Sequence, residues 1–370
     1  MVRILAVNWR DMKNPDAGGA EVHLHEILKG LVAKGHSATL VVSGYAGGGD
    51  EDSCDGIRVI RRGRWYNANF AIPMFLRGHL RRNDYDLIVE DINKIPFFIP
   101  AMTGTRVIAV VPHLFGTTVF RETNPLLASY VFFWEQFIPF IYQSCRFVSI
   151  SPSTRDDLIA RGIRSDRIDV VLCGLDQGVY RRIDSCERFE VPTLIHFGRI
   201  RKYKAVDTVI RVLAMLRRKL PDVRLLIVGD GPEKPNLEAL TRKMGLTDAV
   251  EFCGVLSTER LVETLNRSHL FINASPKEGW GLTVIEANAC GVPVLASNRP
   301  GLKDSLRDGE TGYLVEYGDV AGFAERAYEL LTRPDLWRRM SERGVEVARS
   351  LTWERTVAEM EEIFLRETAG

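Results

Sequence analysis

The stretch LFINASPKEGWGLTVIEANACGVPVLA, residues 270–296, contains a complete strand–loop–helix–strand unit. A short apolar run at 270–272 precedes a glycine-containing loop. An apolar helical segment begins near Leu282, and a second β-branched run follows at 292–296. Continuous apolar strands that alternate with helices are typical of parallel sheets covered on both faces. The stretch therefore predicts a doubly wound α/β sheet.

The loop and helix of this unit carry two carboxylates, Glu278 and Glu286. An ionised glutamate is almost never buried without a partner, so we expect a polar group to meet Glu286 on its apolar helix. Free N–H groups at the helix start attract phosphate, and Gly281 lets the backbone approach a ligand closely. Thr283 and Glu286 share one helical face, so the carboxylate can reach a diol such as ribose behind that phosphate. The alternative is a helix cap with an exposed glutamate.

The alternation of strands and helices runs through the chain in two series. It predicts two Rossmann-like doubly wound domains, residues 1–175 and 192–351, joined by a linker at 176–191, with a helix in 352–370 that packs back on the first domain. Ligands of open parallel sheets bind beyond the carboxyl ends of the strands, so the site is expected in a cleft between the domains. The segment GGGDEDSCDG, residues 47–56, is expected to be a mobile loop.

Composition excludes several classes of protein. Among 370 residues, 49 basic and 48 acidic side chains leave no global field to attract nucleic acid. The 6 cysteines show neither C-x-x-C pairs nor His–Cys ligand spacing, which indicates free thiols in a cytoplasmic protein. No signal peptide is expected at the start of the chain, and the most apolar stretch, 130–142, is too short to span a bilayer.

Two other segments suit phosphate. HFGRIRKYKAVD, residues 196–207, places Arg199 and Lys204 after a strand, where guanidinium and ammonium groups can hold a diphosphate. The alternative is a solvated basic loop. NPDAGGAEVHLHEIL, residues 14–28, follows the first strand, and Gly18 and Gly19 permit close backbone approach. No G-x-G-x-x-G motif follows an early strand, so a hydride-transfer enzyme is disfavoured.

Taken in order, these segments resemble family 4 of the retaining glycosyltransferases, which have the GT-B architecture of two Rossmann-like domains facing across a cleft. The likeness covers nearly the whole chain. It includes GGAE at 18–21, SPSTRDDL at 151–158, GRIRKYKAVD at 198–207 and EGWGLTVIEA at 278–287. Glu278 and Glu286, separated by seven residues, match the E-x7-E signature of the family.

The resemblance implies a retaining transfer of a hexosyl-type group from a nucleotide-diphosphate sugar to a glycan or lipid-linked acceptor, in the synthesis of cell-envelope or surface polysaccharide or glycolipid. Residues 1–175 would face the acceptor and residues 192–351 would bind the donor. The implied catalytic residues are His113, Arg199, Lys204 and Glu278. The implied donor-binding residues are Gly18, Gly19, Arg199, Lys204, Val255, Glu278, Gly279, Trp280, Gly281, Leu282, Thr283 and Glu286.

Since Arg199 and Lys204 would neutralise the leaving diphosphate, neither a metal nor another cofactor is expected. The D-x-D pattern at 84–86 precedes a strand and is expected to be a structural turn. The chain departs from the family pattern at Ala205, which replaces a glycine, at Trp280, which replaces a phenylalanine, and at Asp304, which replaces a glutamate.

On the acceptor side, Glu90, Asp91 and Asn93 follow the carboxyl end of a strand, where they could position an acceptor or take its proton. Arginines at 61–82 and aromatic residues at 130–142 suit docking on an anionic membrane surface, and hence a peripheral place at the inner face of the cell membrane. The alternative is an ordinary basic face. Other activities that suit the architecture are those of an epimerase, a phosphorylase or an inactive donor-binding module.

Overall fold

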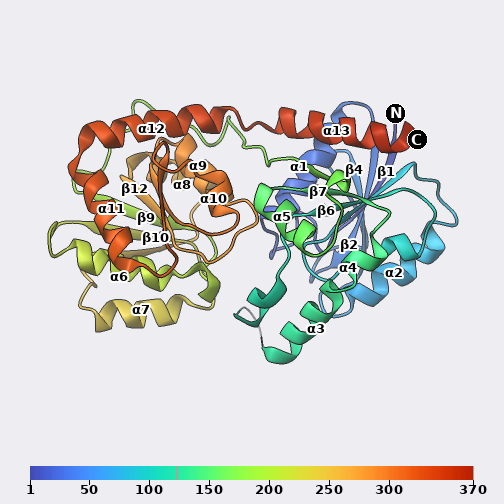
Figure 1. The fold of residues 1–370 in the computed structure, drawn as a ribbon, viewed down its shortest axis with the longest axis horizontal. Helices are drawn as coiled ribbons and strands as arrows, with labels where there is room; N and C mark the ends of the chain where they lie inside the picture. Colours follow the sequence, from blue (N-terminus) through green and yellow to red (C-terminus); the bar gives the residue numbers. More distant parts are fainter. Residues whose placement is uncertain (122–123, 370) are drawn as a thin grey trace. The chain divides into compact units, whose positions relative to one another are not determined.

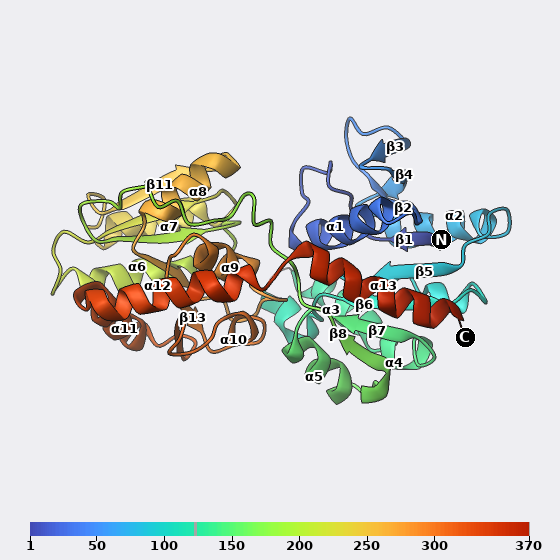
Figure 2. The same ribbon diagram turned by 90° about the horizontal axis from the view of Figure 1, so that it is seen from above.

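The computed structural model of the protein describes residues 1–121 and 124–369. Contacts within the chain divide it into two compact units, each built on its own sheet (Figures 1 and 2). The first unit comprises Met1–Gly174 together with Trp353–Gly370, and the second unit comprises Leu175–Thr352. Among the described helices, none is long and apolar enough to cross a membrane.

The first unit contains an eight-stranded sheet in the order β3-β4-β2-β1-β5-β6-β7-β8. All neighbouring strands are parallel except β3, which runs antiparallel to β4 at the edge. The strands are β1 Arg3–Val7, β2 Ser37–Gly44, β3 Glu51–Cys54, β4 Ile57–Arg64, β5 Leu87–Asp91, β6 Val107–Val111, β7 Arg146–Ser149 and β8 Ile168–Val170. The α-helices are α1 Gly19–Ala33, α2 Ala68–His79, α3 Pro125–Glu135, α4 Ile138–Ile141, α5 Pro152–Ala160 and α13 Trp353–Ala369.

Two apolar clusters cover the two faces of this sheet, because the central strands are buried on both sides. Apolar side chains of α1 and α13 cover one face, and those of α2, α4 and α5 cover the other. The two helices on the first face touch closely: a Cβ added at Gly30 of α1 would lie 2.4 Å from Cγ2 of Val357 in α13. The last helix of the chain is thus part of the first unit (Figure 2).

The expectation of a loop at residues 47–56 is wrong for part of that segment. Residues Glu51–Cys54 form β3, which pairs with β4 through a two-residue turn at Asp55 and Gly56. Both turn residues have positive φ, 51° and 77°, as a type I′ hairpin requires. The acidic composition of this segment gave no sign of a strand. An edge strand needs no apolar face when its backbone pairs on one side.

The second unit contains a six-stranded parallel sheet in the order β11-β10-β9-β12-β13-β14. The strands are β9 Thr193–Phe197, β10 Arg224–Val228, β11 Val250–Gly254, β12 Leu270–Asn273, β13 Val294–Ser297 and β14 Gly312–Val315. The α-helices are α6 Val206–Leu216, α7 Lys234–Lys243, α8 Thr258–Arg267, α9 Leu282–Ala289, α10 Leu302–Ser305, α11 Val320–Thr332 and α12 Pro334–Arg349.

Apolar clusters again cover both faces of this sheet. Residues 176–191, which the sequence suggested as a linker, belong to the second unit and pack on one of these clusters. Val179, Tyr180, Ile183 and Phe189 are partly buried against it. This segment lacks periodicity because it forms neither a helix nor a strand. It packs on the second unit through single apolar residues.

Candidate functional site

The carboxyl edge of the second sheet brings together two charged residues from distant segments. Lys204 ends the short 3₁₀ helix η4, Lys202–Lys204, after β9, and Glu278 lies in the loop between β12 and α9. Lys204 Nζ lies 2.6 Å from Glu278 Oε1, and their side chains are 15% and 14% exposed. Burial opposes the charge on Lys204, but the Glu278 carboxylate outweighs it, so the pKa of Lys204 is raised. This edge of the sheet thus holds a partly buried ion pair.

A close backbone contact sets the path of the Glu278 loop. The N–H of Glu278 donates to the carbonyl oxygen of Pro300 at 3.1 Å. At the next residue, Gly301, φ is +81°, and an added Cβ would lie only 2.2 Å from the carbonyl oxygen of Glu278. Only glycine fits there. Asp304 accepts the N–H of Gly301 at 3.1 Å, so its carboxylate helps to hold this turn.

Helix α9 begins directly after Gly281, which has left-handed geometry (φ 74°, ψ 51°), and no side chain caps its first turn. Its partly exposed residues are Leu282, Thr283 and Glu286, while the rest of the helix is buried. Thr283 and Glu286 therefore share the accessible face, as expected from their spacing. The uncapped N–H groups at the helix start suit a phosphate, and the carboxylate one turn later suits the hydroxyl groups of a polyol in the same ligand.

The polar partner of Glu286 is the hydroxyl of Tyr180, which lies close enough for hydrogen bonding to lower the pKa of the carboxyl. Burial raises the pKa of Glu286 to about 7, and this hydrogen bond partly offsets the rise. Sequence reasoning missed Tyr180 because it lies in the supposed linker, far from Glu286 along the chain. Its only signal was an aromatic hydroxyl in an otherwise featureless segment.

Several buried polar atoms around this edge have no hydrogen-bond partner among the described residues: His196 Nε2, Ser275 Oγ, Trp280 Nε1 and Ser297 Oγ. The imidazole of His196 lies near the ion pair, since the charges of both Lys204 and Glu278 affect its pKa. Burial lowers that pKa to about 4, and Nδ1 lies 2.9 Å from the carbonyl oxygen of Ile272. Nδ1 therefore carries the proton, and Nε2 is a buried acceptor.

The remaining predicted donor residues of the second unit differ in exposure. Arg199 is exposed and close enough to Lys204 to affect its pKa. Val255, after β11, is 78% exposed and offers an apolar surface at the same carboxyl edge. The indole of Trp280 is only 4% exposed, so its ring packs in the protein. Gly279 lies partly exposed in the loop between Glu278 and α9.

In the first unit, Gly18 and Gly19 stand at the start of α1 at the carboxyl edge of the sheet, with Gly19 exposed. Glu21 Oε2 accepts the N–H of Gly18 at 2.7 Å and so holds the loop. His113 lies in the loop after β6, with its ring 4.9 Å from that of Phe115.

Two buried side chains hold the His113 loop. Glu135 of α3, which is fully buried, accepts the N–H groups of Phe115 and Gly116 at 2.7 and 2.8 Å. On the other side, Thr154 Oγ1 donates to the carbonyl oxygen of Pro112 at 3.0 Å. The sequence analysis assigned no role to Glu135. Its partners lie in another loop, and no spacing points to them.

The structure contradicts the acceptor-side prediction for Glu90. Its side chain is fully buried, and it accepts hydrogen bonds from Phe97 N at 2.6 Å, Ile99 N at 3.2 Å and the Tyr142 hydroxyl at 2.7 Å. Burial raises the pKa of Glu90 to about 7. Successive strand residues point to opposite faces, so Glu90 points toward the core that contains Tyr142 and has no access to an acceptor.

Asp91 and Asn93, by contrast, join a polar cluster with Asn8 at the carboxyl edge. Asn93 Nδ2 donates to Asn8 Oδ1 at 2.9 Å, and Asn8 Nδ2 lies 3.4 Å from Asp91 Oδ2. Asp91 Oδ1 and Asn93 Oδ1 are buried acceptors without a donor among the described residues. Burial, together with Glu21 and Glu90, raises the pKa of Asp91 well above its ordinary value.

Two family models match consecutive parts of the chain. The model "Glycosyltransferase Family 4" matches residues 17–178, and "Glycosyl transferases group 1" matches residues 186–347. Together they span both units, and the chain belongs to the family 4 glycosyltransferases. The two parallel-sheet α/β units are those of the GT-B glycosyltransferases, as the sequence predicted.

Curated relatives match part of the chain. It is 37% identical over 172 residues to N-acetyl-alpha-D-glucosaminyl L-malate synthase of Bacillus anthracis, covering 46% of this chain and 44% of the relative. It is 37% identical over 209 residues to D-inositol 3-phosphate glycosyltransferase of Nocardia farcinica, covering 53% and 46%. The matches therefore span less than half the length of these two relatives.

Solved structures match over the full length. Sucrose-phosphate synthase from Thermosynechococcus elongatus has a TM-score of 0.85 at 20% identity, with 100% of both chains covered. WaaG, a glycosyltransferase involved in lipopolysaccharide biosynthesis, has a TM-score of 0.78 at 18% identity, with 98% and 99% covered. Anabaena Alr3699/HepE in complex with UDP and glucose has a TM-score of 0.77 at 17% identity, with 99% and 100% covered. At such identities the likeness shows the fold.

Proposed function

We propose that the protein transfers a hexosyl-type group from a nucleotide-diphosphate sugar to a glycan or lipid-linked acceptor, with retention of the anomeric configuration. The observation that carries this proposal is the Lys204–Glu278 pair, 2.6 Å apart, on the same sheet edge as the uncapped start of α9 and the partly exposed residue Glu286. A cation, free amides and two carboxylates match the phosphates, the sugar and the ribose of such a donor. The UDP complex of HepE makes uridine the first base to test.

In this proposal the protein acts mainly through charge. Arg199, Lys204 and the amides of residues 281–283 would stabilise the negative charge that develops on the leaving diphosphate. A donor phosphate that draws Lys204 away would leave Glu278 free to accept from the hydroxyls of the transferred sugar. Glu286 would accept from the ribose hydroxyls in place of the Tyr180 hydroxyl. With two cationic side chains available, the reaction needs no divalent metal, and we expect transfer to persist in a chelator.

The first unit would supply the acceptor side. The His113 loop is held on both sides by Thr154 and Glu135, which gives the imidazole a fixed position next to the strand end. Asp91 and Asn93 hold buried oxygens without donors among the described residues at the same edge, whereas Glu90, whose oxygens are already hydrogen-bonded, takes no part in this proposal. The description of WaaG as a glycosyltransferase involved in lipopolysaccharide biosynthesis supports a product in the cell envelope.

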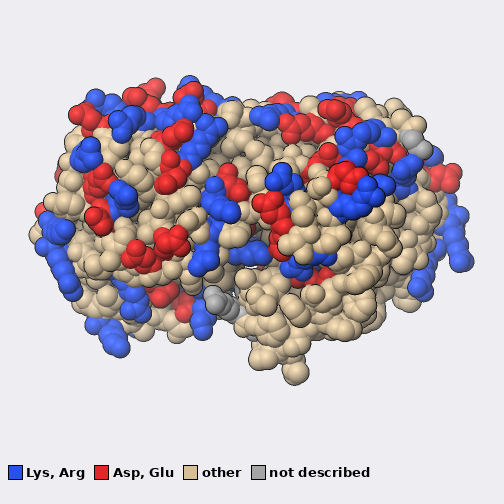
Figure 3. Space-filling view, in the orientation of Figure 1, with Lys and Arg blue, Asp and Glu red and all other residues tan. Residues whose placement is uncertain are grey.

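We also propose that the first unit docks on an anionic membrane surface. Large apolar side chains are exposed on and beside α2 and α3, and Asn69 Nδ2 of α2 lies 2.6 Å from the Tyr130 hydroxyl of α3, which joins the two helices. The lobe around α3 is almost free of charged residues in Figure 3. Arginines on and after α2 would contact the headgroups. The exposed residues are Trp65, Tyr66, Phe70, Met74, Phe120, Leu126, Leu127, Phe133 and Phe140.

Flotation with vesicles tests this docking. The protein should float with phosphatidylglycerol vesicles at low salt and detach as salt is added, because basic side chains contribute to binding. A double change, Phe70→Ser with Leu126→Ser, should abolish flotation, while Met215→Ser at an exposed site of the second unit should not. Equal flotation of all three proteins would contradict the proposal.

Release of nucleoside diphosphate from a panel of nucleotide-sugars tests the activity. A transferase releases it only with an acceptor, apart from slow hydrolysis. An epimerase converts the donor without acceptor, a phosphorylase needs free phosphate, and an inactive module binds donor without turnover. Glu286→Ala should abolish donor-dependent release, whereas Glu316→Ala should not. A protein that binds no nucleotide-sugar would contradict the proposal. The anomeric configuration of the product, read by NMR, tests retention separately.

A further inference from the structure

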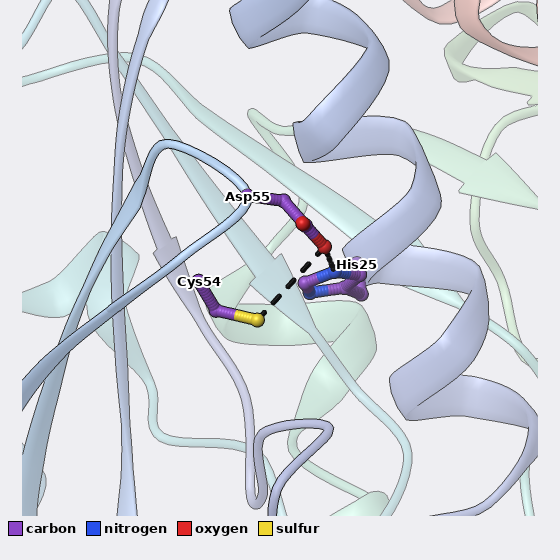
Figure 4. Close-up of side chains that lie close together, drawn as sticks. All are labelled: His25, Cys54 and Asp55. Atoms are coloured by element: carbon purple, nitrogen blue, oxygen red, sulfur yellow. Dashed lines mark hydrogen bonds and ion pairs between the residues drawn. The ribbon is translucent and has the colours of Figure 1, made fainter.

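A cluster of three different side chains lies in the first unit on the hairpin of β3 and β4 and the facing helix α1. His25 Nε2 lies 2.7 Å from Asp55 Oδ2, and Cys54 Sγ lies 3.9 Å from the same oxygen (Figure 4). One ligand atom of each residue lies within 4.8 Å of the others. The side chain of His25 is 8% exposed, and Cys54 packs partly against the apolar cluster under α1.

We propose that His25, Cys54 and Asp55 bind a divalent transition metal, with Zn²⁺ as the ion that the ligand set fits best. Imidazole nitrogen, thiolate sulfur and carboxylate oxygen are the ligands that zinc takes in proteins. Three protein ligands leave one tetrahedral position for water. Nothing in the transfer reaction uses these residues, so the proposal is independent of the donor site.

The distances are close to those that zinc requires. With metal–ligand bonds of about 2.0–2.3 Å, the ligand atoms of a tetrahedral site lie about 3.3–3.7 Å apart. The nitrogen and oxygen must therefore separate from 2.7 Å, and the sulfur must approach the oxygen from 3.9 Å and the nitrogen from no more than 4.8 Å, so closing the site takes movements of about an ångström. On binding, the Cys54 thiol loses its proton to solvent, and the neutral imidazole carries its proton on Nδ1 in place of Nε2, which frees the Nε2 lone pair that now faces Asp55.

The backbone around the cluster holds the ligands in place. Cys54 pairs with Ile57 across the two-residue turn, which fixes the directions of Cys54 and Asp55. The hairpin tip also packs on α1, since a Cβ added at Gly56 would lie 2.8 Å from Cγ1 of Val32. His25 comes from the middle of that helix, so the site combines rigid elements.

Nearby cations have their own carboxylate partners. The Lys13 ammonium lies 2.8 Å from Asp52, and the Lys29 ammonium lies 3.1 Å from Glu26. Their repulsion of a metal ion is thereby reduced. A bound metal would link the hairpin of β3 and β4 to α1. This link adds a contact to β3, which has only one neighbouring strand. It would therefore stabilise the first unit, which gives a readout other than transfer.

The experiment uses the full chain, stripped with a chelator and kept reduced. Titration with Co²⁺ should give one equivalent bound, with a thiolate-to-metal charge-transfer absorption that Zn²⁺ removes by displacement. Zinc at about a hundredfold excess over its dissociation constant should raise the melting temperature by about 5 °C.

Cys54→Ser should lose the charge-transfer band and the thermal shift, whereas Cys186→Ser, at another partly exposed thiol, should keep both. Asp55→Asn preserves the turn, because asparagine tolerates positive φ, and it should weaken binding at least tenfold. His25→Gln should do the same. The proposal is overturned if the wild type binds no metal, if binding survives in Cys54→Ser, or if Cys186→Ser abolishes the band.

Discussion

Lys204 Nζ and Glu278 Oε1 lie 2.6 Å apart on two loops of one sheet edge, and both side chains are mostly buried. In the proposed reaction these two groups have different partners, the diphosphate and the sugar. In the structure, each of the two charges is satisfied by the other. Leaving either charge buried without the other would cost several kcal/mol, roughly, so each group needs an oppositely charged partner at this edge.

The first prediction concerns this pair. Lys204→Ala removes a cation that would stabilise the leaving group, so kcat should fall about 10²–10³-fold, and donor affinity should weaken. Steady-state kinetics and calorimetric titration with a nucleotide-sugar measure the two effects. Lys202→Ala, on the same short helix but exposed, is the matched control and should leave both nearly unchanged. An equal effect of the two changes would show that only general positive charge matters.

The second prediction concerns pH. Burial raises the pKa of Glu286 to about 7, so below that pH the folded protein holds this carboxyl protonated, and it cannot accept from both ribose hydroxyls. Donor affinity should therefore rise up to about tenfold between pH 6 and pH 8. A nucleotide-sugar is the probe, because it has no terminal phosphate that titrates in this range.

Two variants assign this pH dependence. Glu286→Gln should bind weakly at every pH and show no such rise. Tyr180→Phe removes the hydrogen bond that lowers the pKa of Glu286, so the midpoint should shift to higher pH. A profile that is unchanged in Glu286→Gln would mean that another group titrates.

The third prediction concerns Ala205, which has left-handed geometry (φ 50°, ψ 39°) at the start of α6. That conformation costs an L-residue about 1–2 kcal/mol, and glycine avoids it. Ala205→Gly should therefore raise the free energy of unfolding of the second unit by about 1 kcal/mol. Ala214→Gly in the same helix should lower it by about 1 kcal/mol, as glycine does in a helix interior. Urea unfolding measures both, and the same sign for both would refute the assignment of strain.

The fourth prediction concerns Glu135, which accepts two N–H groups of the loop after His113. Glu135→Ala leaves these donors without partners, which should destabilise the first unit by about 2–4 kcal/mol. Turnover should fall while donor affinity stays the same, because the donor residues Lys204, Glu278 and Glu286 lie in the second unit. Gln136→Ala, at the next and exposed position, is the control. A loss of donor affinity in Glu135→Ala would contradict a positioning role confined to the His113 loop.

Much of the fold could be predicted because it depends on local pattern. Continuous apolar runs identified the parallel strands, since a strand that is buried on both faces consists mainly of apolar residues. The carboxyl-edge loops followed from those strands, and the structure places Lys204, Glu278, Thr283 and Glu286 on one edge. The edge strand β3 was not predicted, because its side chains are not buried and the segment therefore has no apolar pattern.

The sequence alone determined the two doubly wound sheets, the order of their elements and the charged loops at their carboxyl ends, because period and spacing are local properties. Only the tertiary structure decided which side chains meet. It brought Tyr180 to Glu286, Glu135 to the His113 loop, and His25 to Cys54 and Asp55, and it turned Glu90 into the core. Hydrogen bonds and ligand sets between distant residues depend on packing and on the face from which each side chain projects, and no spacing along the chain encodes them.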